Sequence, residues 1–218
     1  MFVGHYGVSF AVKSIDKHLP LWLLFIAVQF VDVLWAIFIL TGIEKVRISP
    51  GITATNPLDL YYMPYTHSLL AALIWSGVAF VGYKFFRRNR GYAAFLLAAA
   101  VFSHWVLDLV VHRPDLPLYD DTYKVGFGVW NYPALALTLE ASLLFGGIFL
   151  YLRSSIPVSL IGKFGVPIFG VMLLLLQAMV FFGAPPASPS AAALTALFSY
   201  VVLSGVAYWL EKKRLRSA

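Results

Sequence analysis

The 218-residue chain lacks cysteine altogether, and it has few charged residues, only 12% of the total. The absence of cysteine excludes disulfide bonds, thiolate metal ligands and a cysteine nucleophile. The charged fraction is about half that of a soluble globular protein. Hydrophobic residues instead make up 61% of the chain. The composition therefore predicts an integral membrane protein, and the length predicts a single transmembrane domain over residues 1–218.

Long apolar runs follow one another along the sequence, separated by polar breaks. They predict an all-α fold, a polytopic membrane helix bundle of about six transmembrane helices. The spans are expected at about residues 19–41, 65–86, 91–112, 131–152, 162–182 and 191–210. The segment before them, residues 2–15, is apolar but too short to cross a bilayer. We expect it either to lie flat at the membrane interface or to dip into the membrane.

The net charge of +6 comes from basic residues gathered at the ends of the spans. This placement argues against a nucleic-acid partner, because it is the pattern of membrane topology. The basic clusters lie at residues 13–17, 84–90, 153–163 and 212–216. With six spans all four fall on one side, which the positive-inside rule makes the cytoplasmic side, together with the C-terminus. The two long loops, residues 42–64 and 113–130, then lie on the opposite side.

Ionisable side chains stand inside several predicted spans, where each costs several kcal/mol unless it faces the bundle interior and finds a partner. In the third span the pattern HxxxDxxxH places side chains four residues apart, on one face of a helix. Imidazoles and carboxylates in this arrangement can reach a single ion, as in helical zinc sites. Counted from the span ends, most of these groups share one layer near the loop side. The residues are Asp32, His67, His104, Asp108, His112 and Glu140.

Each of these residues also has a structural interpretation. Asp32 and His104 could hydrogen-bond between helices and fix the packing. His112, followed by Arg113 and Asp115, could be a solvated helix end, and Glu140 could pair with a buried tyrosine or a basic group. His5 reaches the polar layer only if residues 2–15 enter the membrane.

Four motifs stand out in the first half of the chain: GHYG around His5, the aspartate Asp32 in the first span, THS around His67, and HxxxD formed by His104 and Asp108. Together they resemble the bacterial membrane-bound metal-dependent hydrolase family. The likeness covers about residues 2–115, and its first motif differs in having Val31 before the aspartate. Members are small proteins of the bacterial inner membrane, also described as similar to zinc-dependent phospholipase C. The resemblance implies that His5, Asp32, His67, His104 and Asp108 are metal ligands, with His112 and Asp115 extending the same face.

The function that the resemblance and the polar layer imply is metal-dependent hydrolysis of a lipid or lipid-linked ester, phosphoester or acyl ester, near the outer leaflet. Zn²⁺ suits a set of histidine and carboxylate ligands, and Mn²⁺ is the alternative. Glu140 or Asp115 could then act as the proton acceptor. The rival expectation is a proton- or metal-coupled transporter that uses the same intramembrane cluster. So few spans would build a wide transport pathway only in a homo-oligomer.

Overall fold

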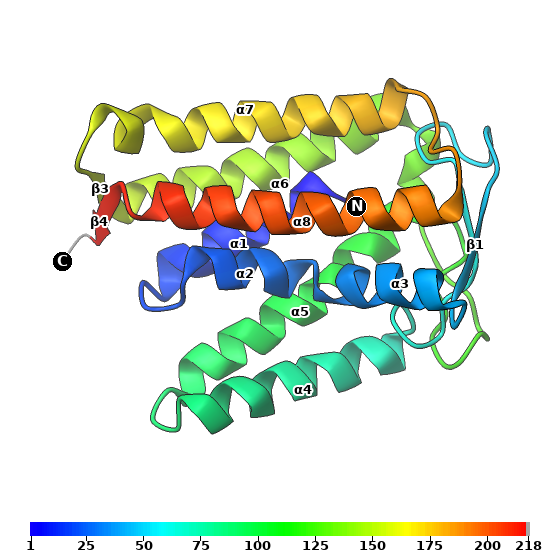
Figure 1. Ribbon diagram of the computed structural model, residues 1–218, viewed down its shortest axis with the longest axis horizontal. Helices are drawn as coiled ribbons and strands as arrows, with labels where there is room; N and C mark the ends of the chain where they lie inside the picture. The colour runs from blue at the N-terminus through cyan, green and yellow to red at the C-terminus, as the bar shows by residue number, and fades with distance from the viewer. Residues whose placement is uncertain (217–218) are drawn as a thin grey trace.

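The computed structural model describes residues 1–216, which form a multi-pass membrane protein built almost entirely of helices (Figure 1). Five helices are long and apolar enough to cross a membrane, and a bent pair supplies a sixth span. The predicted spans agree with these elements to within four residues at each end. The helices are α1 (Val3–Ile15), α2 (Leu21–Val28), α3 (Phe30–Thr41), α4 (Leu69–Phe86), α5 (Gly91–Val111), α6 (Pro133–Arg153), α7 (Leu160–Phe182) and α8 (Pro189–Glu211).

Large apolar side chains cover the outside of the bundle. Val81 on α4, Leu175 on α7 and Phe198 on α8 are each more than 60% exposed. In water such a surface would be unfavourable, whereas hydrocarbon chains solvate it and leave the backbone to satisfy its hydrogen bonds within each helix.

The first span is broken. Helices α2 and α3 meet at Gln29 with a bend of 54°. The Gln29 side chain turns inward, where its Nε2 donates a hydrogen bond to the carbonyl of Phe2 at 3.2 Å. A break of this kind leaves backbone groups near the bend free for other partners.

Helix α1 lies inside the bundle, which decides between the two positions expected for residues 2–15. Nine of its thirteen residues are buried, His5 and Phe10 completely. It packs on α6 so closely that a methyl group on Gly7 would overlap the Leu143 carbonyl, and one on Gly147 would overlap Gly7. The helix starts near the middle of the bundle and runs to the end where the chain turns into α2 (Figure 1).

The two ends of the bundle differ in character. At one end lie the turns α1–α2, α4–α5 and α6–α7 and the C-terminal strand, so the four basic clusters share this end, as predicted (Figure 1). There β3 (Ser155–Pro157) pairs with β4 (Arg214–Arg216). At the other end, here named the loop end, β1 (Lys45–Ile48) and β2 (Leu58–Tyr62) form an antiparallel hairpin within the first long loop. A short 3-10 helix, Val129–Asn131, leads into α6.

Candidate metal centre

The structure brings all six predicted ligands together in the bundle interior. α1 supplies His5, α3 supplies Asp32, and α5 supplies His104 and Asp108 from one face. His67 lies one residue before the N-cap of α4, Ser68, whose side chain caps that helix by accepting a hydrogen bond from Ala71 N at 3.0 Å. His112 directly follows α5.

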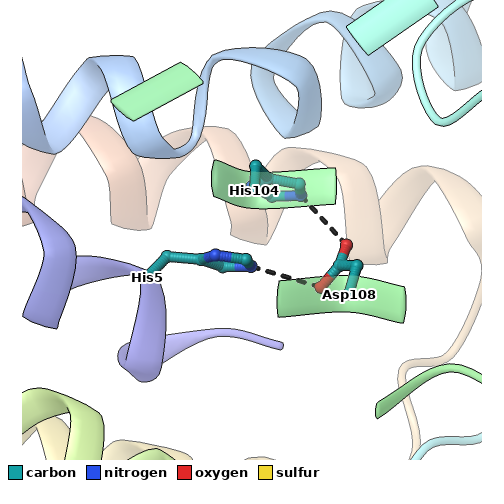
Figure 2. Close-up of side chains that lie close together, drawn as sticks. All are labelled: His5, His104 and Asp108. Atoms are coloured by element: carbon teal, nitrogen blue, oxygen red, sulfur yellow. Dashed lines mark hydrogen bonds and ion pairs between the residues drawn. The ribbon is translucent and has the colours of Figure 1, made fainter. Parts of the chain in front are cut away.

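Asp108 lies at the centre of this cluster. Its Oδ1 is 3.2 Å from His5 Nε2, and its Oδ2 is 3.1 Å from His104 Nε2 (Figure 2). The same Oδ2 lies 3.4 Å from His112 Nε2 and 3.8 Å from His67 Nε2. The α-amino group of Met1 contacts Oδ1 at 2.5 Å. One carboxylate thus faces four imidazoles.

Asp32 is the centre of a second group of contacts, next to that of Asp108. Its Oδ1 is 3.2 Å from His67 Nε2 and 3.5 Å from His104 Nε2, and its Oδ2 accepts a hydrogen bond from Tyr200 OH at 2.8 Å. Two overlapping groups therefore have ligand atoms within 4.8 Å of one another, one formed by His5, His104 and Asp108 and the other by Asp32, His67 and His104. His104 belongs to both groups.

Three of the histidines are held by their Nδ1 atoms. His104 Nδ1 bonds the carbonyl of Val28 at 2.6 Å, beside the break in the first span. His112 Nδ1 bonds Asp115 Oδ1 at 2.9 Å. A carbonyl or carboxylate oxygen only accepts, so in both rings Nδ1 carries the hydrogen.

His67 is held through a longer chain. Its Nδ1 lies 2.7 Å from the Thr66 hydroxyl, which also contacts Glu44 Oε2 at 2.7 Å. Glu44 further accepts from the backbone N–H groups of Tyr65 and Thr66 at 2.8 and 2.9 Å. With Glu44 ionised, the hydroxyl donates to the carboxylate and accepts from His67 Nδ1–H.

These hydrogen bonds have an electrostatic consequence. A neutral imidazole with hydrogen on Nδ1 presents a lone pair at Nε2. Here the Nε2 atoms face the oxygens of Asp32 and Asp108, which repel a lone pair. The arrangement is favourable only with positive charge beside the carboxylates. The α-amino group of Met1 supplies one such charge at Asp108 Oδ1, and protons on the rings or a bound cation would supply it at the remaining oxygens. Anchored Nδ1–H groups and converging Nε2 atoms are the usual arrangement of metal-binding histidines.

His112 lies just beyond the membrane-spanning part of α5 and is exposed to the same negative charge of the neighbouring carboxylates. Burial alone would lower its pKa, but the neighbouring Asp108 and Asp115 raise the pKa above the ordinary value of 6.5. Negative charge therefore outweighs desolvation at this edge of the cluster.

His5 differs from the other three histidines. Its ring stacks on that of His104 with centroids 4.0 Å apart, and its Nε2 faces Asp108. Its Nδ1 is buried and finds no partner among residues 1–216. His5 is therefore placed by ring stacking and by the packing of α1 rather than by an Nδ1 anchor.

The two predicted proton acceptors have different surroundings. Glu140 on α6 accepts from the backbone N–H groups of Phe2 and Gly4, at 3.1 and 2.6 Å, and so holds the first turn of α1. Asp115 is bound by His112 on one oxygen and by Arg113 Nε on the other, at 3.1 Å. Glu140 lines the cavity described next, whereas Asp115 lies outside its lining.

A cavity of about 680 Å³ opens beside the cluster at the loop end. Asp32, His67, Asp108, His112 and Glu140 lie in its wall, which continues along α3, α7, α8 and the β1–β2 loop. Its volume is in the usual range for a small-molecule site. The candidate centre is thus buried and still accessible to a ligand.

Sequence reasoning missed several residues that surround the cluster. Tyr200 binds Asp32 from α8, Thr66 and Glu44 hold His67, and Trp105 Nε1 donates to the His67 carbonyl at 2.9 Å. Thr66 was visible only as a neighbour of His67. A single tyrosine, tryptophan or loop glutamate has no spacing that marks it as a partner.

No protein-family model, curated protein or solved structure significantly matches this chain. The resemblance to membrane-bound metal-dependent hydrolases stays a prediction, carried by the motifs.

Proposed function

We propose that the protein is a membrane-embedded, metal-dependent hydrolase that acts on a lipid or lipid-linked ester. The observation that carries the proposal is the convergence of three Nδ1-anchored histidines, by their Nε2 atoms, on two aspartates at the wall of a cavity. Packing alone would not require four imidazoles around one carboxylate, because each buried polar group adds a desolvation cost.

The donor set of imidazole nitrogens and carboxylate oxygens suits Zn²⁺, with Mn²⁺ as the alternative. His5, Asp32, His67, His104, Asp108 and His112 would hold it. When bound, such an ion polarises a phosphoryl or acyl oxygen and lowers the pKa of water. Among the chain's own groups, we assign proton acceptance to Glu140, because it faces the cavity. Asp115 is instead assigned to fixing the orientation and tautomer of His112.

The position of the site supports an amphiphilic substrate. The cluster lies within a membrane bundle near its loop end, so a bilayer lipid reaches it more readily than a water-soluble metabolite. By the positive-inside rule we place the protein in the bacterial inner membrane, with the basic end and the C-terminus on the cytoplasmic side and the loop end on the outer side.

Transport is the second candidate function, and the packing between the cluster and the basic end of the bundle argues against it. Between the cluster and the basic end, the interior is filled mainly by apolar side chains that include Phe10, Phe25, Leu97 and Leu144. Among the buried polar side chains there, Ser9 and Lys13 are bound to the carbonyls of Leu24 and Leu19. A translocation path would require polar groups or water along this stretch.

The test is the metal content of the purified protein, measured by plasma mass spectrometry beside a His104→Ala, Asp108→Ala double variant. We expect one or two equivalents of zinc or manganese, lost in the double variant and kept in Asp121→Asn, a carboxylate change in an outer loop. Loss of hydrolysis of lipid phosphoesters and acyl esters in the double variant would accompany it. A folded wild type that takes up no metal, or equal hydrolysis by both proteins, would overturn the proposal.

A further inference from the structure

Trp35 carries a buried hydrogen-bond donor that the structure leaves unused. The residue is 5% exposed and lines the cavity, and its indole Nε1–H has no partner within residues 1–216. It follows Asp32 by three residues on α3, so it lies on the same helix face about one turn nearer the loop end. A buried donor without an acceptor is unfavourable, and a ligand oxygen that accepts from it removes this penalty.

The cavity wall beyond Trp35 is mostly apolar, with Gln177, Thr195 and Ser199 among its polar members, and it reaches the membrane surface. Leu176, Met179 and Val180 line it from α7, and small residues including Ala192 and Ala196 line it from α8. Met179 and Val180 are also 69% and 56% exposed on a membrane-spanning helix. Residues that line a cavity and also face the hydrocarbon mark a side opening towards the lipid.

We propose that this cavity binds a membrane lipid by one acyl chain, laid between α7 and α8, with a phosphoryl or ester oxygen of the lipid accepting a hydrogen bond from Trp35 Nε1–H. This inference rests on the proposed hydrolase function in one respect, because it identifies the bound lipid as the substrate of that reaction. The lipid enters sideways from the bilayer. Its scissile ester then lies between the indole and the cluster.

The chemistry restricts the ligand. An indole N–H donates and cannot accept, so the ligand atom must be an acceptor such as a phosphoryl or carbonyl oxygen. The apolar wall favours a hydrocarbon chain over water, and a chain that comes from the bilayer enters the cavity without first being exposed to water. A soluble phosphoester would satisfy the indole and leave the apolar wall empty.

The experiment maps bound lipid without turnover. Full-length protein in phosphatidylcholine nanodiscs is irradiated with a trace of phosphatidylglycerol that carries a diazirine in its acyl chain, and the cross-linked peptides are identified by mass spectrometry. We expect cross-links on the cavity-lining residues of α7 and α8. Ala196→Trp, which fills the cavity, should reduce them at least fivefold, whereas Leu194→Trp on the exposed side of the same helix should not.

Trp35→Phe removes the donor and keeps an aromatic ring, so it is expected to fold. We expect it to weaken cavity cross-linking, and to raise KM for the lipid, by about five- to tenfold with little change in kcat. Cross-links spread evenly over the outer surface, or an unchanged map in both Trp35→Phe and Ala196→Trp, would overturn the inference.

Asp108→Asn separates the two proposals. Suppose that the wild type binds no metal and hydrolyses no lipid, while both the wild type and Asp108→Asn show cavity cross-links. That result would remove the hydrolase proposal and keep the lipid site. Hydrolysis by the wild type without cavity cross-links would do the reverse.

Discussion

Thr66 connects a loop carboxylate to a buried imidazole through a single hydroxyl. Its Oγ1 is 2.7 Å from both Glu44 Oε2 and His67 Nδ1. Thr66→Val keeps the shape and removes the hydroxyl, which leaves two buried polar partners unsatisfied. We expect a loss of about 1–3 kcal/mol in stability and about tenfold in metal affinity. Thermal unfolding and chelator competition measure these, and Thr66→Ser, which keeps the hydroxyl, should behave like the wild type.

A second pair of substitutions tests the different roles proposed for Asp115 and Glu140. Asp115→Asn weakens the hold on His112 Nδ1, so metal affinity should fall about 10- to 100-fold. Glu140→Gln keeps one acceptor oxygen for the first turn of α1, so metal content should fall much less than in Asp115→Asn, whereas kcat should fall by about 100-fold or more, as expected for loss of a proton acceptor. Titration against a chelator and steady-state kinetics provide the two readouts. Full metal affinity in Asp115→Asn together with a large loss of kcat would exchange the two roles.

At the scale of elements, the contact between α1 and α6 depends on glycine. No side chain fits where Gly7 and Gly147 meet, because a methyl group on either would overlap backbone atoms of the other helix. Gly7→Ala and Gly147→Ala should each destabilise the fold by about 2–3 kcal/mol and weaken metal binding through His5. Gly146, next in sequence, has open space around it. Gly146→Ala is therefore the matched control, and equal melting temperatures for Gly146→Ala and Gly147→Ala would contradict the packing argument.

The spans and the HxxxDxxxH face could be predicted from the sequence because apolar length and four-residue spacing are local properties. The position of α1 was not predictable, since an apolar segment of thirteen residues suits an interface and an interior equally. Tyr200 and Val28 were also missed. Their contacts to Asp32 and His104 join residues 168 and 76 positions apart, and the break at Gln29 has no proline or glycine to announce it.

At the scale of the whole molecule, the orientation can be tested directly because the chain has no cysteine. Single cysteines at Arg88 and Lys212 mark the basic end, and one at Ala54 marks the loop end; all three positions are exposed. A membrane-impermeant maleimide should label Ala54→Cys in intact spheroplasts and the other two only in inverted vesicles. The reverse pattern would place the candidate centre near the inner leaflet and exclude an outer-leaflet substrate.

The burial of α1 also bears on how the chain is made. Its packing partner α6 carries Gly147, 140 residues after Gly7. At ordinary synthesis rates that distance takes roughly 10 to 30 seconds. During this interval the face of α1 that carries Gly7 has no α6 to pack on, although Phe25 on α2 and His104 on α5, which stack on Tyr6 and His5, are already made. Asp108 is likewise made before Glu140 can hold the first turn of α1. Helix α1, although it precedes α2 to α8 in the chain, thus reaches its final position only after α6 has been made.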